Sequence, residues 1–403
     1  MQRTRWTHRA WQRWWLLFAL VTAVPAWGAT WLVGADSSTP RLADALRRAA
    51  DGDTILVASG DYHGDVGVIN QKRLTIRGVG TRPVFHADGQ HAEGKAQLVL
   101  RDGEVLIENI AFTGTRVPSG NGAGIRFERG HLTLRRCAFT DNQIGLLTNN
   151  DESAELVVED SEFGMAPGEP GRLEHLLYVG RIAALSVTGS RFYQGHTGHL
   201  LKSRARRSLL AYNRIVDGPL GSASYEVEFP NGGQVTLIGN TIGQSAATQN
   251  PAVVSYGAEG GHWPDNMLVL AYNTLLSPAV PGAVFLRFWS ERLPADSLVH
   301  AINNLTLGPV ALLPVGPGLF AGNVALGLPV LPSTAETASD FAPDAAWRGR
   351  AVAPRLDNGT DLAPKAEFSF PAGTRPLAPP RHWSAGAFQS DLAEKLMLNE
   401  IGN

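Results

Sequence analysis

Five positive side chains lie within thirteen residues of this chain, from Lys202 to Arg214, and no carboxylate interrupts them. The segment opens with LLKS, residues 200–203, which has the alternation of a half-buried strand. A lysine acts as a base near neutral pH only if its pKa is lowered, and neighbouring cations have that effect. An arginine such as Arg204 can bind a carboxylate through two parallel hydrogen bonds. The segment therefore predicts proton abstraction beside a carboxylate, with a solvated sheet edge as the alternative.

Neighbouring predicted strands supply further groups for chemistry. Side chains alternate between the two faces of a strand, so in YEVEF, residues 225–229, we expect Glu226 and Glu228 to point outward. Residues two apart on one strand stand about 6.5–7 Å apart, near the spacing of the carboxylates in an inverting glycosidase, so a hydrolase is one alternative. The predicted catalytic residues are Lys202, Glu226 and Tyr178. The predicted substrate-binding residues are Arg204, Glu228, Asn231, Arg126 and Arg287.

The elements that hold these residues repeat along the chain. Segments such as LTLRRCAF (132–139) and VTLIGNTI (235–242) alternate apolar and polar residues, and then carry a small or amide residue two places before an apolar one. Short strands that recur every 20–33 residues, without a helical pattern, predict a β-solenoid whose coils stack so that equivalent residues form ladders. The ladder position is predicted at Ile110, Cys137, Ser161, Ser190, Asn213, Asn240, Asn273, Asn303 and Asn323.

A helix is predicted near residues 40–50, ahead of the first coil. Thr39 is a suitable N-cap and Pro40 suits the first helical position. Leu42 and Leu46 then fall on one face of the helix, together with two alanines. Because the open end of a solenoid is a sheet edge that can recruit other strands, we interpret this helix as a cap.

Two stretches carry a resemblance to a known family. LADALRRAADGDTILVASGDY (42–62), followed by KRLTIRGVG (72–80), resembles the opening of right-handed parallel β-helix proteins of the pectate-lyase-like superfamily. RPLAPPRHWSAGAFQ (375–389) resembles the closing segment of many of them. The resemblance implies an all-β fold, a single right-handed parallel β-helix of about ten coils with an N-terminal capping helix and an extended C-terminal tail. It also implies that a long polysaccharide binds along one sheet face.

The segment LLKS, with Asn213 at the next ladder turn, is similar to the chondroitinase B and alginate lyase group of this superfamily. That similarity implies that Lys202, just before Ser203, removes the proton beside a uronate carboxylate. The catalytic Arg-His-Gly of the group would fall at Pro230-Asn231-Gly232, where the first two residues differ. No cofactor and no metal are predicted; calcium stays open, although the carboxylates expected just before Lys202 are not seen.

Composition and charge narrow the class of protein. The net charge of −2 argues against a general nucleic-acid binder. Four arginines followed by an apolar stretch, Trp14–Val24, predict a signal peptide at 1–28, and hence a secreted or periplasmic monomer that leaves the membrane after cleavage.

The β-helix is predicted at 29–330 and the tail, packed on it, at 331–403. With Cys137 as the only cysteine, no disulfide can form within the chain, and we expect this thiol to be a small buried spacer.

The resulting hypothesis is a β-helix protein that acts on an acidic polysaccharide, by lyase or epimerase chemistry at a uronate. A non-catalytic glycan-binding or envelope-structural β-helix is the first alternative, and a glycoside hydrolase is the second.

Overall fold

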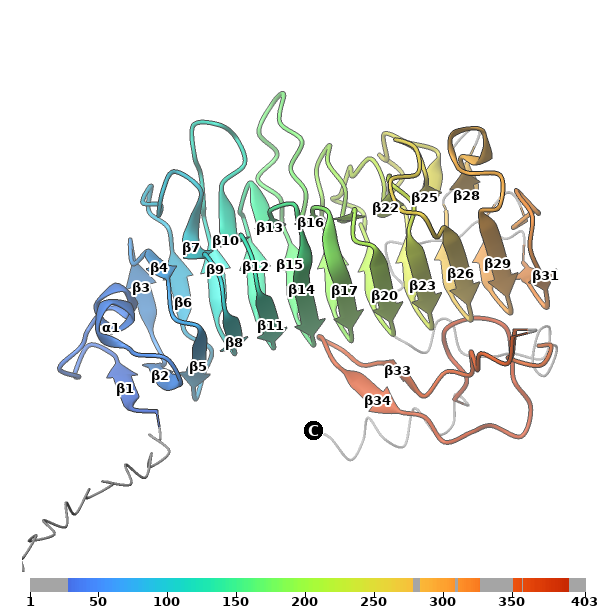
Figure 1. Ribbon diagram of the computed structural model, residues 1–403. Helices are drawn as coiled ribbons and strands as arrows, with labels where there is room; N and C mark the ends of the chain where they lie inside the picture. The colour runs from blue at the N-terminus through green and yellow to red at the C-terminus, as the bar shows by residue number, and fades with distance from the viewer. Residues whose placement is uncertain (1–27, 278–282, 309–310, 327–350, 357, 391–403) are drawn as a thin grey trace, which may run out of the picture.

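The computed structural model describes residues 28–277, 283–308, 311–326, 351–356 and 358–390. These residues form a right-handed parallel β-helix of about ten coils, so the predicted fold is confirmed (Figure 1). Each complete coil gives one strand to each of three parallel sheets. The predicted signal peptide, except Gly28, and the predicted tail residues 331–350 and 391–403 lie outside the described residues.

The largest sheet of the described chain begins beside the capping helix and runs the length of the molecule. We call it the twelve-stranded sheet. Its strands, in spatial order, are β1 (Thr30–Val33), β2 (Asp53–Ala58), β5 (Arg73–Val79), β8 (Glu104–Glu108), β11 (His131–Arg135), β14 (Asp151–Glu159), β17 (Ile182–Thr188), β20 (Arg207–Ala211), β23 (Gln234–Ile238), β26 (Met267–Ala271), β29 (Leu298–Ile302) and β31 (Phe320–Ala321).

A short turn leads from each of these strands except β1 to the eleven-stranded sheet of the described chain. Its strands are β3 (Asp61–His63), β6 (Val84–His86), β9 (Ala111–Thr113), β12 (Ala138–Thr140), β15 (Glu162–Gly164), β18 (Arg191–Tyr193), β21 (Arg214–Val216), β24 (Thr241–Gly243), β27 (Thr274–Leu276), β30 (Leu305–Leu307) and β32 (Val324–Ala325).

Longer loops lead on to the nine-stranded sheet of the described chain, which holds the predicted site. Its strands are β4 (Gly67–Ile69), β7 (Ala96–Leu100), β10 (Ala123–Phe127), β13 (Ile144–Thr148), β16 (Leu177–Val179), β19 (Leu201–Ser203), β22 (Val227–Phe229), β25 (Ala252–Tyr256) and β28 (Val284–Phe288). After β28 the chain makes one 3-10 turn, η1 (Ser290–Arg292).

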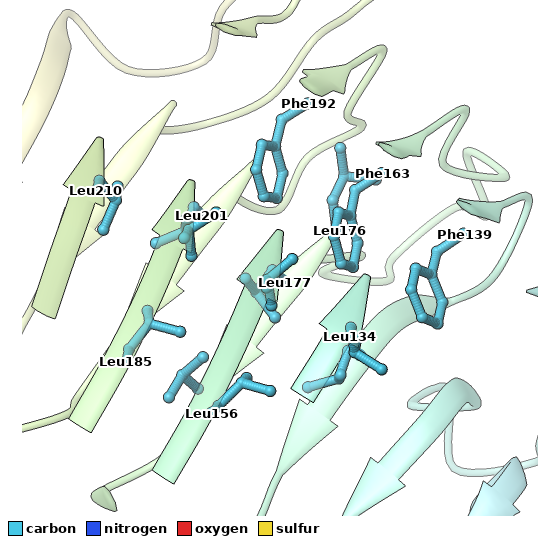
Figure 2. Close-up of a cluster of buried hydrophobic side chains, with 14 of the residues drawn as sticks. Leu134, Phe139, Leu156, Phe163, Leu176, Leu177, Leu185, Phe192, Leu201 and Leu210 are labelled. Atoms are coloured by element: carbon cyan, nitrogen blue, oxygen red, sulfur yellow. The ribbon is translucent and has the colours of Figure 1, made fainter. Parts of the chain in front are cut away.

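The interior of the β-helix is filled by apolar side chains that stack from coil to coil. Inward positions of in-register parallel strands lie directly above one another, so equal side chains meet. Phe139, Phe163 and Phe192 stack with ring centroids 4.7 and 4.9 Å apart, against leucines such as Leu134 and Leu177 (Figure 2). Burial of these side chains is the main source of stability.

The turn between the twelve- and eleven-stranded sheets carries the predicted ladder. In each turn one residue with positive φ, such as Tyr212 or Tyr272, precedes the ladder residue. Asn240 shows the ladder geometry: its Nδ2 donates to Asn273 Oδ1 (2.9 Å), and its Oδ1 accepts from the Asn213 backbone N–H (3.0 Å). These side chains therefore satisfy buried backbone groups between coils.

In the last coils, one residue of the predicted ladder is wrong. Asn273 bonds to Asn304, which in turn bonds to Asn323, whereas Asn303 takes the positive-φ position before it. The prediction of Asn303 is wrong by one residue because Thr306, and not Leu305, holds the inward position that follows. Cys137 lies fully buried on the ladder, as expected.

Helix α1 (Leu42–Arg48) covers the N-terminal end of the β-helix (Figure 1). Its buried face includes Leu42 and Leu46. The prediction of Thr39 as N-cap is wrong, because the helix begins later and no local side chain caps it. The carboxylate of Asp65, from the following coil, instead accepts hydrogen bonds from the backbone N–H groups of Leu42 (2.6 Å) and Ala43 (3.0 Å).

The described part of the C-terminal segment packs along the outside of the β-helix (red in Figure 1). It includes an antiparallel pair, β33 (Ala366–Phe368) and β34 (Thr374–Pro376). Leu356 and Leu362 contact Val269 and Ala271 on the outer face of the twelve-stranded sheet. Among the described residues, no helix is long and apolar enough to cross a membrane.

Candidate functional site

The outer face of the nine-stranded sheet carries a row of side chains that crosses seven strands. Strand pairing places Tyr178 beside Lys202, and Lys202 beside Glu228. We call the whole set the outward row: Arg126, Leu147, Tyr178, Lys202, Glu228, Ser255 and Arg287. Adjacent strands lie about 4.8 Å apart, so the row is about 29 Å long.

Glu226 does not face outward, and that prediction is wrong. Its side chain is fully buried in the interior, and neither carboxylate oxygen finds a hydrogen-bond partner from another described residue. In the register of the sheet, Glu226 aligns with Leu200 in the previous coil and Val253 in the next, and both are buried. The chain bends before β22, so Glu226 and Val227 both point inward. Glu226 therefore cannot reach a ligand on the outer face.

Lys202 is held between two carboxylates. Its Nζ lies 2.9 Å from Glu228 Oε2 and 3.3 Å from Glu259 Oε1. It also lies 5.9 Å from the centroid of the Tyr178 ring. Glu228 comes from the adjacent strand β22, and Glu259 comes from the loop that follows β25. Lys202 is therefore mostly shielded from solvent on the side that faces the loop.

Arg204 extends the same cluster. Its guanidinium binds both oxygens of Glu259, with contacts of 2.5 and 2.8 Å, and donates to Asn231 Oδ1 (2.7 Å). Its Nε donates to the Tyr178 hydroxyl (3.2 Å). Its own carbonyl accepts from Trp263 Nε1 (3.1 Å). Arg204 therefore links Tyr178 and Asn231 to Glu259.

The pKa values of two glutamates in this cluster are shifted in opposite directions. Burial raises the pKa of Glu228, and the nearby Lys202 offsets this only in part. The hydrogen bond from Arg204 lowers the pKa of Glu259, and burial opposes this only in part. We refer to Lys202, Arg204, Glu228 and Glu259 together as the ion cluster. Since environments that separate two pKa values in this way are typical of functional sites, the ion cluster is the candidate active site.

Two histidines lie beneath the ion cluster. The His175 and His199 rings are 4.8 Å apart, and His199 Nδ1 lies 3.2 Å from Glu228 Oε2. Burial, with Lys202 and Arg204 nearby, lowers the pKa of His175 to about 3. Burial likewise holds the pKa of His199 well below its usual value. Both rings are therefore neutral near pH 7, and neither adds a positive charge to the site.

The remaining predicted residues lie at the two ends of the outward row. Arg126 pairs with Glu128 (3.3 Å), and Arg287 pairs with Glu291 (2.8 Å). The guanidinium of Arg287 also stacks 4.3 Å from the Trp289 ring centroid. Arg126 is three strands away from Lys202 and Arg287 is two strands away from Glu228, so neither takes part in the ion cluster. They can contact only the outer units of a long ligand.

The five positive side chains between residues 202 and 214 go to three places. Lys202 and Arg204 join the ion cluster, whereas Arg206 and Arg207 pair with Asp265 (3.5 Å) and Glu155 (3.8 Å). Arg214 belongs to β21 of the eleven-stranded sheet, where its guanidinium lies 5.3 Å from the centroid of the Phe370 ring. Only two of the five therefore belong to the site. Among the described residues, no three His, Cys, Asp or Glu side chains come together in a way that could hold a metal ion.

Glu259, His175 and His199 are the residues that sequence reasoning missed. Glu259 lies in the glycine-rich segment GAEGG (257–261), which carries no recognised motif. A lone carboxylate among glycines, directly after a site strand, is the signal that could have found it. The histidines lack metal-ligand spacing, but each stands three residues before an outward-row residue, Tyr178 or Lys202.

Comparison with known proteins supports the fold. No protein-family model matches the sequence, and no curated protein matches it significantly. The structure is similar to the crystal structure of pectate lyase Pel9A, with a TM-score of 0.54, 16% identity, and 90% of this chain and 96% of that chain covered. This likeness shows a shared parallel β-helix. The crystal structure of a GH136 lacto-N-biosidase from Eubacterium ramulus gives a TM-score of 0.43 at 13% identity, over 74% of this chain and 68% of that chain.

Proposed function

We propose that this protein acts on an acidic polysaccharide that binds along the outward row, and that Lys202 removes the proton beside a uronate carboxylate. The observation that carries the proposal is the convergence of Tyr178, Lys202, Arg204 and Glu228 on one patch of the nine-stranded sheet. A base, a proton donor and a carboxylate-binding arginine are the groups that such a reaction needs. The outward row is also long enough to contact several sugar units. A pectate lyase with the same fold is in keeping with the proposal.

The base must first lose its own proton. Glu228 Oε2 is 2.9 Å from Lys202 Nζ, and burial raises the pKa of Glu228, which favours its protonated form. Transfer of one proton from Lys202 to Glu228 converts the ion pair into a neutral amine and a neutral acid. The neutral amine of Lys202 can then take the C5 proton of the uronate.

Two outcomes follow from proton removal. In elimination, the electrons of the C5–H bond form a C4–C5 double bond, the C4–O bond breaks, and the leaving oxygen takes a proton. Tyr178 is placed to supply that proton, because its hydroxyl accepts from Arg204 Nε and keeps its own O–H for donation. In epimerisation, the Tyr178 O–H instead gives its proton to the opposite face of C5, and no bond to oxygen breaks. Arg204 and Asn231 stabilise the negative charge that builds on the carboxylate in both cases.

Glycoside hydrolysis is a second candidate, favoured by the opposite pKa shifts of Glu228 and Glu259. The contacts of the two carboxylates to Lys202 Nζ measure 2.9 and 3.3 Å, so the two oxygens are at most about 6.2 Å apart. A separation of about 5–5.5 Å between carboxyl groups is typical of retaining glycosidases. Glu228 would be the acid and Glu259 the nucleophile. The earlier pairing of Glu226 with Glu228 is ruled out by the burial of Glu226.

A substrate screen tests the proposal. The protein is incubated with pectate, alginate and glycosaminoglycans, and ultraviolet absorbance detects the double bond of an elimination product. Proton exchange at C5 in heavy water, followed by NMR, detects an epimerase, and new reducing ends without absorbance detect a hydrolase. Binding without any product would support the glycan-binding alternative and contradict an enzyme.

Substitution of the base gives a sharper test. Lys202→Ala should abolish turnover while the far-ultraviolet circular dichroism stays unchanged, because an outward side chain adds little to the core. Lys72→Ala is the matched control, since Lys72 is an exposed lysine paired with Asp102 (2.6 Å) at a distant coil. Turnover by Lys202→Ala at the wild-type rate would contradict the assignment of the base.

A further inference from the structure

In the ion cluster, the carboxylate of Glu259 already pairs with both cations. Arg204 binds both oxygens of Glu259, and Lys202 Nζ lies 3.3 Å from one of them. This two-pronged contact is the arrangement in which arginine binds any carboxylate. The Glu259 side chain is 44% exposed, whereas those of Lys202 and Arg204 are only 12% and 15% exposed. The Glu259 side chain therefore covers the two cations on the side that faces solvent.

The loop that holds Glu259 is built from small residues. Glu259 is flanked by Ala258 and Gly260, and Gly257 and Gly260 both have a φ of 87°, in the left-handed region that favours glycine. The loop is fixed at its base by a hydrogen bond from the Glu259 N–H to the Pro230 carbonyl (2.8 Å). The side chain can rotate away from Arg204 without any change to this backbone bond. Because the Glu259 side chain is partly exposed, water can hydrogen-bond to its carboxylate when the side chain leaves Arg204.

We propose that Arg204 and Asn231 form the subsite for the carboxylate of an acidic sugar unit, and that Glu259 fills this subsite until the sugar displaces it. This inference rests on the proposed function and adds to it that Glu259 occupies the carboxylate subsite before substrate binds. It explains how two nearly buried cations stay paired when no substrate is bound. It also gives a basis for selection, because a neutral sugar offers no charge to replace that of Glu259.

Occupation of the subsite by Glu259 weakens substrate binding by a factor that can be worked out. If the subsite occupied by Glu259 is favoured about fivefold over the open subsite, the open subsite is populated about one part in six, and the apparent affinity falls about sixfold. Removal of the charge by Glu259→Gln should therefore strengthen binding of acidic oligosaccharides by about sixfold. Binding of neutral oligosaccharides should stay unchanged.

The experiment measures binding by isothermal titration with oligogalacturonates and oligoalginates, and with neutral oligogalactosides of equal length. Tyr178→Phe serves as the common background, because loss of the proton donor suppresses turnover while the ring that Arg204 and Lys202 cover is kept. Glu155→Gln is the matched control for Glu259→Gln. Glu155 has the same charge and a similar exposure, 43%, and pairs with Arg207 on another face.

Three results decide between the outcomes. Tighter acidic binding in Glu259→Gln, absent in Glu155→Gln and lost when Arg204→Ala is added, supports the occupied subsite. Weaker or unchanged acidic binding in Glu259→Gln overturns it, and the proposed function still stands if the wild type forms an unsaturated or epimerised product. Failure of every variant, and of the wild type, to bind or convert any acidic oligosaccharide overturns the proposed function and the subsite together.

Discussion

The buried carboxyl of Glu226 offers the most decisive test of the structure. Its neighbours in the same column of the interior, Leu200 and Val253, are apolar, and its carboxylate oxygens have no partner from another described residue. We expect Glu226→Leu and Glu226→Gln to stabilise the protein, which is the reverse of the usual effect of a core substitution. Leucine matches the residue that the previous coil carries at this position.

The size of the effect follows from two contributions. A buried polar group without a hydrogen bond costs about 1–3 kcal/mol, and Glu226→Leu removes that cost. Repacking of a side chain of similar volume costs less than about 1.5 kcal/mol. Glu226→Gln keeps an unpaired polar group but removes the possibility of ionisation. Comparison of the two variants therefore separates the cost of polarity from the cost of charge.

The charge contribution depends on pH in a known direction. Burial, with Asp217 nearby, raises the pKa of Glu226 well above its ordinary value of 4.5. Above pH 4.5 the unfolded chain releases this proton while the folded chain keeps it. The free energy of unfolding therefore falls by about 1.4 kcal/mol per pH unit, until the folded carboxyl also ionises. In Glu226→Gln this decline is absent.

Asp217 also makes the free energy of unfolding fall as the pH rises, but over a lower range of pH. Burial raises its pKa to about 6, so its contribution to the decline ends near pH 6. The window from pH 6 to 8 therefore isolates Glu226. His175 and His199, whose pKa values are lowered by burial, contribute equally to wild type and variant and cancel in the comparison.

Urea unfolding followed by tryptophan fluorescence, at several pH values between 5 and 8, measures these differences. Glu104→Gln is the control, since Glu104 is an exposed carboxylate at the start of β8. The gap between Glu226→Gln and wild type should widen with pH, and Glu226→Leu should be more stable than wild type at every pH. Destabilisation by Glu226→Leu of more than about 2 kcal/mol, or a gap that is constant with pH, would refute the assignment of Glu226 as an unpaired interior carboxyl.

Two further predictions concern the turn ladder. Asn240→Ala should lower the free energy of unfolding by about 1–3 kcal/mol, measured by urea unfolding, because it leaves the buried Asn213 N–H without a partner and removes a hydrogen bond to the Leu210 carbonyl; a change below about 0.5 kcal/mol would contradict the role of the ladder. Burial raises the pKa of the Cys137 thiol to about 11, so a thiol reagent at pH 8 should label it only after unfolding; rapid labelling of the native protein would show that this position is open.

The sequence predicts the fold well because the solenoid repeats one local pattern many times. Errors at single positions average out over many coils, so the period and the three-sheet architecture are secure. Asn213, Asn240 and Asn273 are each followed, two places later, by an apolar residue, and the ladder register follows from this. At Asn303 the rule fails, because two asparagines adjoin and the inward residue of that coil is Thr306.

The candidate site was predicted only in part, for a physical reason. Strict alternation holds inside a strand, but β22 is only three residues long, and the bend before it points two successive residues inward. Comparison with Leu200-Leu201 and Val253-Val254 in the flanking coils would have indicated an interior position for Glu226. Glu259 lies beyond the reach of such reasoning, because a loop side chain approaches Arg204 only through the tertiary fold.

The in-register stacking of the nine-stranded sheet has a consequence for how such a surface can change over time. Every residue of the outward row comes from a different coil, and each coil contacts mainly its two neighbours. Duplication or loss of a whole coil would therefore lengthen or shorten the row in steps of about 4.8 Å, without altering the groups on either side. A point substitution changes the chemistry at one step only. Length and chemistry of the outward row can thus vary independently.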